Sequence, residues 1–228
     1  MPRTDVATDS SHIKIRVIQD GDQFHASIEN VFVASSSTVI GLIPPLIQVL
    51  DDAVVEHLTT LRAVHAGTVL WNERALLLPG ATHAGKSSLV AELLRRGATY
   101  FSDEFALIDP EGFVHPYPRP LLLRNGRPAQ SPVLPGEFNA PVGDAPARVG
   151  WILALEYQPD YNWSVDLVPQ SEAVITLLKN TPHFLKESPD MVSTFQRAVE
   201  GAACYAGRRA DAVPAVDQIL RLIANLAG

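Results

Sequence analysis

The sequence predicts an α/β fold in which helices flank a central sheet. The first observation is a short apolar run, Ala75 to Leu78, followed by a glycine-rich loop and by an amphipathic helical pattern from Ser87 to Arg96. The second is the alternation of apolar and polar residues between His12 and Val33, which is typical of β-hairpins. The third is the helical spacing of apolar residues from Asp211 onward. Strand and helix patterns that alternate along one chain favour helices packed on a sheet.

Composition limits the classes of protein to which this chain can belong. At 228 residues it is long enough for one compact α/β domain. The formal net charge of −7 argues against nucleic acid or an anionic membrane as the main partner. Cys204 is the only cysteine, so the sequence predicts neither a disulfide framework nor a cysteine metal cluster. Because no apolar run reaches membrane-spanning length and the N-terminus is polar, we expect a cytoplasmic protein.

The first quarter of the chain carries no chemical motif. Residues 1–11 are expected to be flexible, and residues 12–62 to form a small β-hairpin and helix segment. Helical spacing extends from Ile40 to Leu61, and the pair Asp51-Asp52 marks a point where this helix can divide in two. Residues 63–228 are expected to form the main domain, with which the segment before it makes one compact unit.

Two predicted strands surround the glycine-rich loop. Residues 63–71 form a strand that a three-residue turn, Asn72 to Arg74, joins to the strand entering the loop. After the loop helix, the apolar strand of residues 98–108 is interrupted by Asp103 and Glu104. Acids do not belong inside a buried strand unless a cation or another partner compensates them. We interpret this pair as functional; the alternative is a turn between two short strands.

The second half of the chain alternates between strand and helix patterns after one long irregular stretch. Residues 125–150 are rich in Pro, Gly and small polar residues, and we interpret them as a mobile lid or substrate-binding loop rather than a passive insertion. The elements expected after it are strands at 151–157 and 163–167, and helices at 171–179, 188–203 and from residue 211. Ser171 and Asp211 are the expected caps of two of these helices.

The segment from Gly80 to Ser87 has the pattern of a phosphate-binding loop, a glycine and four free positions followed by Gly-Lys-Ser. Unpaired N–H groups and the positive end of the peptide dipole attract anions to the first turn of the helix that follows. Lys86 supplies a cation for the β and γ oxygens, and the Ser87 hydroxyl is placed to bind Mg²⁺. The alternative, a coincidental glycine-rich turn, is disfavoured by the flanking strand and helix. The residues expected to hold the phosphates are Gly80, Ala81, Thr82, His83, Ala84, Gly85, Lys86, Ser87 and Ser88.

The stretch from His65 to Arg124 resembles the catalytic domain of the HPr kinase/phosphorylase family. The resemblance rests on a histidine strand at residues 64–67, on the phosphate-binding loop, and on the segment from Arg96 to Glu104, which occur at about the family's spacing. The Tyr-Pro-Arg-Pro segment at residues 117–120 is similar to divergent relatives found with peptide natural products, including lasso-peptide kinases that phosphorylate a serine of the precursor peptide. The resemblance implies a mixed, largely antiparallel central sheet with flanking helices, and a ring-like homo-oligomer.

The resemblance also implies roles for individual residues. Asp103 matches the family's general base, which takes the proton from the acceptor hydroxyl, and Glu104 matches the second acid, near Mg²⁺. His65 matches the histidine beside that acid, which orients or tunes it. Arg119 and Arg124 are alternative candidates for neutralising charge on the transferred phosphoryl group.

The chain departs from the family pattern at three points. His83 stands where the family has glycine, and whether it contacts phosphate or faces solvent is open. The acidic pair is Asp103-Glu104 instead of two aspartates. The basic, glycine-rich signature that the family ties to phosphorolysis has no clear match. We therefore expect kinase activity and not the reverse reaction.

These observations together predict an ATP- and Mg²⁺-dependent kinase that transfers the γ-phosphoryl group to a serine or threonine hydroxyl of a peptide or small protein, such as a lasso-type precursor. One alternative is a small-molecule kinase built from the same parts, and another is a nucleotide-dependent module that binds a peptide by strand addition without phosphorylating it. ATP and GTP remain alternative donors, although the sequence lacks the Asn-Lys-x-Asp pattern of guanine-reading switches. The expected catalytic residues are Asp103, Lys86, His65 and Arg119, and the expected metal ligands are Ser87 and Glu104.

Overall fold

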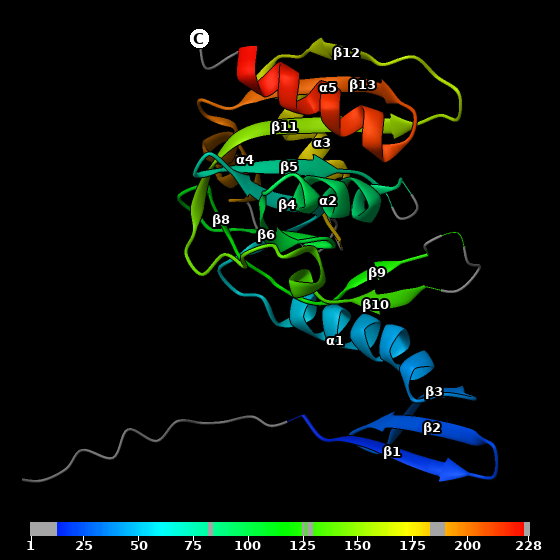
Figure 1. Cartoon of the computed structure of the whole chain (residues 1–228). Coiled ribbons are helices and arrows are strands. Elements are labelled where there is room, and N and C mark those ends of the chain that lie inside the picture. Colours follow the sequence, from blue (N-terminus) through cyan, green and yellow to red (C-terminus); the bar gives the residue numbers. More distant parts are fainter. Residues whose placement is uncertain (1–12, 82–83, 125, 127–129, 183–189, 226–228) are drawn as a thin grey trace, which may run out of the picture. The chain divides into compact units, whose positions relative to one another are not determined.

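The structure, a computed structural model, describes residues 13–81, 84–124, 126, 130–182 and 190–225. Contacts within the chain divide it into two compact units, residues 1–53 and 54–228. The first unit contains a small antiparallel sheet, and the second contains a mixed sheet flanked by helices, so the predicted α/β class is confirmed (Figure 1). None of the helices among the described residues combines the length and the apolar character needed to cross a membrane.

The sheet of the first unit is a three-stranded antiparallel meander. Its strands are β1 (Ile15–Asp20), β2 (Gln23–Ile28) and β3 (Val31–Ser36). The alternation between His12 and Val33 correctly predicts strands here, but the residues after Asp22 form two strands. Glu29 and Asn30 both have positive φ and form a tight turn between β2 and β3, a conformation that asparagine tolerates better than most residues.

A single helix follows the meander and crosses the boundary between the two units. After a 3-10 turn (Ile40–Leu42), α1 (Ile43–His57) runs without interruption. The expected division at Asp51-Asp52 is therefore wrong. The Asp52 carboxylate accepts a 3.1 Å hydrogen bond from the Gln48 side chain one turn earlier, a spacing that supports a helix.

The eight-stranded sheet of the second unit has the order β12-β13-β11-β5-β4-β7-β8, with β6 also paired to β4. β11 runs parallel to both β5 and β13, and the other pairings of this sheet are antiparallel. The strands are β4 (Arg62–Trp71), β5 (Arg74–Pro79), β6 (Thr99–Ser102), β7 (Phe105–Ile108), β8 (Phe113–His115), β11 (Ala147–Tyr157), β12 (Ser164–Leu167) and β13 (Ala203–Arg209).

Helices cover both faces of this sheet (Figure 1). On one face lie α2 (Lys86–Arg95) and α5 (Ala212–Asn225), and on the other lie α3 (Gln170–Lys179) and α4 (Met191–Val199). Successive side chains of a strand point to opposite faces, so Leu76 and Leu78 of β5 pack in the core under α2 and α5, while Leu77 packs under α3 and α4. Strands buried on both faces explain why β5 is a continuous apolar run.

Turn chemistry corrects the predicted boundary between β4 and β5. The turn holds two residues, Asn72 and Glu73, with φ of 45° and 62°, which is the geometry of a tight primed hairpin turn. Arg74, expected in the turn, is the first residue of β5 and pairs with Trp71. The hairpin itself is confirmed.

The predicted long loop at 125–150 is only partly irregular. The strands β9 (Leu121–Leu123) and β10 (Ser131–Val133) form an antiparallel hairpin, a 3-10 turn follows at Pro135–Phe138, and β11 begins at Ala147, four residues before the expected strand. Pro132 lies in β10, the outer member of a two-stranded sheet, where the missing N–H of proline does the least harm. Because residues 125–150 are rich in proline and glycine, their pattern does not predict this hairpin.

Two further expectations change near the C-terminus. α4 ends at Val199 and not at residue 203, because Glu200 is extended and Gly201 has φ of 73°. β13 follows and was not predicted at all. α3 begins at Gln170 after Pro169, so Ser171 is not its cap, whereas the last helix lies where the sequence predicts it.

Candidate active site

The glycine-rich loop, residues 80–87, joins the end of β5 to the start of α2. Gly85 precedes the helix with φ of 76°, and a Cβ added there would collide with the guanidinium of Arg209. Only glycine meets both requirements comfortably. On β4, Gly67 faces Val90 of α2 at a distance that leaves no room for a Cβ, so the helix packs close against the strand. Thr82 and His83 lie outside the described residues.

Lys86, the first residue of α2, is turned back onto the loop. Its Nζ donates hydrogen bonds to the main-chain carbonyls of Gly80 (2.8 Å) and Ala81 (3.1 Å), and only 8% of the residue is exposed. Burial lowers the pKa of Lys86, and the nearby carboxylates of Glu104 and Asp103 partly oppose this shift. The cation is therefore held at the mouth of the loop by weak partners that an anion can replace.

The acidic pair lies in a break between β6 and β7, which both pair with β4. The register shifts by one residue between Thr68 and Val69 of β4, and the Ser102 hydroxyl accepts hydrogen bonds from the N–H groups of Glu104 (3.2 Å) and Phe105 (3.1 Å). Such an irregularity changes the strict alternation of side chains along a strand. Adjacent acids can consequently act in one site, which an ideal strand would prevent.

Arg119 brings the two acids together. Its Nη2 lies 2.9 Å from Oε2 of Glu104 and 3.3 Å from Oδ1 of Asp103, and its side chain is 8% exposed. The Tyr100 hydroxyl lies 2.9 Å from the Arg119 carbonyl and 3.3 Å from the same Asp103 oxygen. Nδ1 of His65 lies 3.2 Å from Oε1 of Glu104. Four of the site residues predicted from the sequence, His65, Asp103, Glu104 and Arg119, thus lie in one cluster.

The two carboxyl groups have opposite pKa shifts. Burial raises the pKa of Asp103, which is 1% exposed, and the charge of Arg119 opposes this only in part. Burial would also raise the pKa of Glu104, but His65, Arg119 and Lys86 together lower it. Oδ2 of Asp103 is buried and has no hydrogen-bond partner of good geometry among the described residues, although the Ser87 hydroxyl is near enough to lower its pKa.

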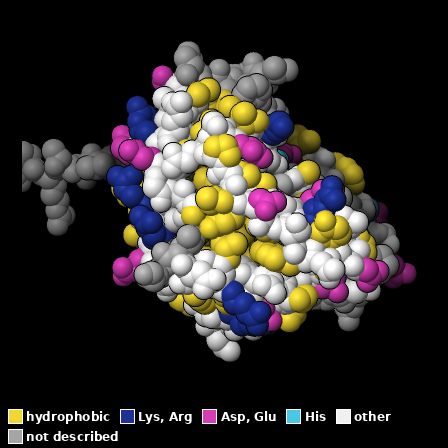
Figure 2. All heavy atoms as spheres, turned by 90° about the horizontal axis from the view of Figure 1, so that it is seen from above, with side chains coloured by type: hydrophobic (Ala, Val, Ile, Leu, Met, Phe, Trp, Pro, Cys, Tyr) yellow, Lys and Arg dark blue, Asp and Glu magenta, His cyan; other side chains and the backbone are white. Residues whose placement is uncertain are grey.

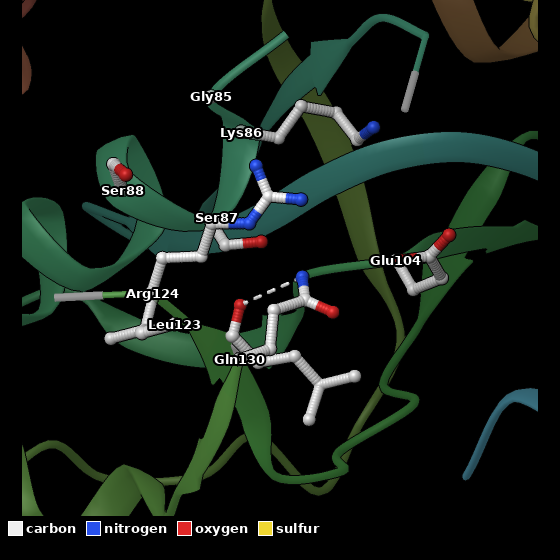
Figure 3. A pocket seen from close by; sticks show the side chains of 9 residues that line it. Gly85, Lys86, Ser87, Ser88, Glu104, Leu123, Arg124 and Gln130 are labelled. Carbon is white, nitrogen blue, oxygen red and sulfur yellow. Dashed lines mark hydrogen bonds between the residues drawn. The ribbon is translucent and has the colours of Figure 1, made fainter. Parts of the chain in front are cut away.

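A cavity of about 180 Å³ opens between the glycine-rich loop and the β9–β10 hairpin. Figure 3 shows Lys86 and Ser87 on one side and Glu104 on another, while Arg124 points from the hairpin toward the start of α2. Arg119 and Arg124 therefore do different things: Arg119 binds the acids, and Arg124 lines the cavity. The residues that line the cavity are Gly85, Lys86, Ser87, Ser88, Glu104, Leu122, Leu123, Arg124 and Gln130.

Arg209, which the sequence does not single out, closes the other side of the loop. It is 2% exposed, and its Nη2 donates to the carbonyls of Ala84 (3.0 Å) and Gly85 (3.1 Å). The guanidinium lies 5.2 Å from the ring centroid of Tyr157. Burial lowers its pKa. The signal that could have placed Arg209 on a strand is the strand-like pattern after Gly201. The helix predicted over residues 188–203 overlaps the start of that pattern and hides it.

Comparison with known proteins adds no family assignment. No protein-family model matches this chain, and no curated protein matches it significantly. Its chemistry is therefore inferred from the geometry of the site.

Proposed function

We propose that this chain is an ATP- and Mg²⁺-dependent kinase of the HPr kinase-like type, which transfers the γ-phosphoryl group to a serine or threonine hydroxyl of a peptide or small protein. One observation carries the proposal. A Gly-x4-Gly-Lys-Ser loop at the start of a helix shares one cavity with Glu104, which Arg119 holds together with the buried Asp103. Phosphoryl transfer needs positioned cations and an acid to receive a proton, and both are present.

The loop supplies positive charge for a polyphosphate. The N–H groups in the first turn of a helix have no partner within it, and Gly85, Lys86, Ser87 and Ser88 at the start of α2 all line the cavity, so an anion bound there would be stabilised. Lys86 would exchange the carbonyls of Gly80 and Ala81 for phosphate oxygens, a stronger partner for a cation. Phosphate binding would thereby break the two hydrogen bonds that Lys86 makes within the loop.

The residues fit Mg²⁺, which takes oxygen ligands and usually keeps several waters besides one or two carboxylates and the substrate phosphates. Among the described residues, the buried Oδ2 of Asp103 has no hydrogen-bond partner of good geometry, and the Ser87 hydroxyl and the Leu122 main chain lie near this carboxyl. A buried carboxylate oxygen in this setting is suited to the ion. Asp103 and Ser87 would hold the metal or its water. When bound, Mg²⁺ neutralises charge on the β- and γ-phosphates.

Exposure favours a division of work between the acids that is the reverse of the one the resemblance implies. Glu104 lines the cavity, whereas Asp103 is 1% exposed and lies behind it, against Tyr100 and Arg119. A general base must come within hydrogen-bond reach of the acceptor hydroxyl, and geometry takes precedence over pKa in choosing it. We propose that Glu104 is the general base that receives the hydroxyl proton, with His65 orienting its carboxylate. Asp103 would then be the acid that binds the metal.

Labelled ATP and candidate precursor peptides test the proposal, with Mg·ATP calorimetry as an acceptor-independent readout. We expect Glu104→Gln to lower turnover at every Mg²⁺ concentration. Asp103→Asn should instead raise the Mg²⁺ concentration needed for half-maximal rate, because it weakens the metal site. The opposite pattern would restore Asp103 as the base. A chain that neither binds Mg·ATP nor labels any peptide contradicts the kinase proposal.

A second candidate, a peptide-binding module that does not phosphorylate its ligand, is favoured by the first unit. β1 is the edge strand of its sheet, and all six of its residues are exposed, so an extended peptide can add to it. Mass spectrometry of the bound peptide after incubation with ATP separates the two functions. Binding with no gain of one phosphate would favour the module.

A further inference from the structure

A second concave region lies beside Arg209, outside the cavity described above. It has a volume of about 210 Å³ and is lined by Tyr161, Asn162, Trp163, Ala210, Pro214, Ala215 and Gln218. A neighbouring hollow of about 350 Å³ also has Trp163 and Gln218 among its lining residues. Hydrophobic side chains gather on the face over β12 and α5, where these residues lie (Figure 2). We call the region lined by Tyr161, Trp163, Ala210, Pro214 and Gln218 the aromatic crevice.

The sheet places this crevice and the glycine-rich loop at the same edge. β5, β11 and β13 are mutually parallel neighbours, so their carboxyl ends, at Pro79, Tyr157 and Arg209, lie together. The loop follows the first of these ends, and the crevice is built from the segments that follow the other two. In open α/β sheets, ligands bind in the crevice outside the carboxyl ends of such strands.

One side chain connects the two places directly. The guanidinium of Arg209 donates through Nη2 to the Ala84 and Gly85 carbonyls of the loop, and through Nη1 to the carbonyl of Ala210 (2.8 Å), which lines the crevice. A single planar group therefore spans from the loop to the crevice.

The position of the acids sets the direction in which a nucleotide lies. In the sheet order, the acids belong to the strands beyond β4, on one side of β5, and β11 and β13 lie on the other side. The phosphoryl group that is transferred must face Asp103 and Glu104. The nucleoside must then leave the loop on the opposite side, toward Tyr157, Arg209 and the aromatic crevice.

We propose that the aromatic crevice binds the heteroaromatic base of the nucleotide, with Trp163 and Tyr161 as stacking surfaces. This inference rests on the proposed function and adds the site of the nucleoside to it. Both rings are half-buried, so each keeps part of its surface accessible, and the guanidinium of Arg208 lies 5.6 Å from the centroid of the Tyr161 ring. The side-chain amides of Asn162 and Gln218 at the same crevice offer donors and acceptors for heteroatoms on the edge of the base.

The test compares a full nucleotide with its phosphates alone. Isothermal calorimetry with Mg·ATP and with Mg·tripolyphosphate is carried out on the full chain and on Trp163→Ala and Tyr161→Ala. Loss of a stacked aromatic group weakens base binding by about tenfold or more. We expect that loss for Mg·ATP and a change of less than about twofold for tripolyphosphate. Trp71→Ala, at the far end of β4, is the matched control and leaves both affinities unchanged.

Tryptophan fluorescence gives an independent readout. We expect Mg·ATP, but not tripolyphosphate, to quench the emission, and Trp163→Phe to remove the quenching that Trp71→Phe retains. Equal losses for both ligands in Trp163→Ala, or equal affinities of the full chain for ATP and tripolyphosphate, would overturn the base site and leave the kinase proposal standing. Binding of neither ligand to the full chain would overturn both.

Discussion

The ammonium group of Lys86 donates a 2.8 Å hydrogen bond to the main-chain carbonyl of Gly80, six residues earlier in the same loop. Under the proposed function, this carbonyl oxygen takes the place that a phosphate oxygen of the nucleotide would fill. The charge is kept buried and close to the acids. This arrangement is the basis of the first prediction.

Replacing this cation should abolish most of the activity. We expect Lys86→Ala to lower the turnover of phosphoryl transfer by about 10² to 10³, the usual scale for removing one preorganised charge stabiliser. Steady-state assays with labelled ATP measure it. Lys179→Ala, at the exposed end of α3, is the control and should keep full turnover. A loss smaller than tenfold in Lys86→Ala would be inconsistent with direct contact to the transferred phosphates.

Removing Arg209 should destabilise the fold as well as the site. Its guanidinium is buried and donates to three main-chain carbonyls, of which only that of Gly85 also accepts from a main-chain N–H among the hydrogen bonds of the described residues, that of Leu89. Arg209→Ala removes all three bonds, and we expect a cost of about 1–3 kcal/mol or more. Urea unfolding measures this cost. The neighbouring Arg208 is exposed and pairs with exposed Glu156, so Arg208→Ala should change stability by less than about 0.5 kcal/mol. Equal effects of the two substitutions would show that burial of Arg209 contributes nothing.

Two glycines with positive φ provide a matched test of the loop geometry. Gly85 and Gly97 have φ of 76° and 95°, but a Cβ at Gly97 would have no atom within 4 Å, whereas one at Gly85 would meet Arg209. Alanine at either position costs about 1–2 kcal/mol in backbone strain. Gly85→Ala should cost more, because Arg209 must move, and should abolish Mg·ATP binding. Gly97→Ala should bind Mg·ATP normally. Thermal melts measure the loss of stability, and calorimetry measures Mg·ATP binding.

Asp103→Asn should stabilise the protein while it impairs catalysis, and the gain should depend on pH. Because the pKa of Asp103 is raised in the folded state, its ionisation opposes folding once the pH exceeds the ordinary aspartate value. The free-energy cost of ionising Asp103 grows as the pH rises to the pKa of the folded state and is constant above that pH. The uncharged amide of Asp103→Asn does not have this cost. The contribution of Glu104 has the opposite sign, being lost as the pH falls, but it is common to both proteins.

We therefore expect the melting temperature of Asp103→Asn to exceed that of the parent chain by more at pH 8 than near pH 4. Each kcal/mol moves the midpoint by about 2–4 °C for a domain of this size. Scanning calorimetry at the two pH values gives the comparison. A gain that is larger in acid would reverse the sign of the inferred pKa shift.

The parts of the site that the sequence predicts are those that lie within one motif. Lys86, Ser87 and Gly85 occupy a fixed spacing, and the strand and helix around them form because of local patterns. Asp103 and Glu104 stand out as acids within an apolar strand, and the break between β6 and β7 explains how both serve one site. The role of Arg119 in holding them required coordinates, because 15 residues separate it from Glu104.

The parts that the sequence misses depend on contacts between distant segments. Arg209 meets Gly85 across 124 residues, and nothing local marks a buried arginine in a strand that follows a helix. The β9–β10 hairpin is not predicted because Pro132 favours a turn over a strand. The pairing of β10 with β9 overrides this local preference. The aromatic crevice joins residues near 160 to residues near 215, so it has no sequence signature at all.

β13 lies between β11 and β12 in the sheet although it is the last of the described strands along the chain. A nascent polypeptide emerges N-terminus first, so β12 has no partner in this sheet until residues 203–209 have left the ribosome. The guanidinium that braces Ala84 and Gly85 arrives with that same strand. If the loop binds a polyphosphate as proposed, that ligand can stabilise the folded loop only after residues 203–209 have emerged, and chains stalled before this strand should be substrates for chaperones even in abundant ATP.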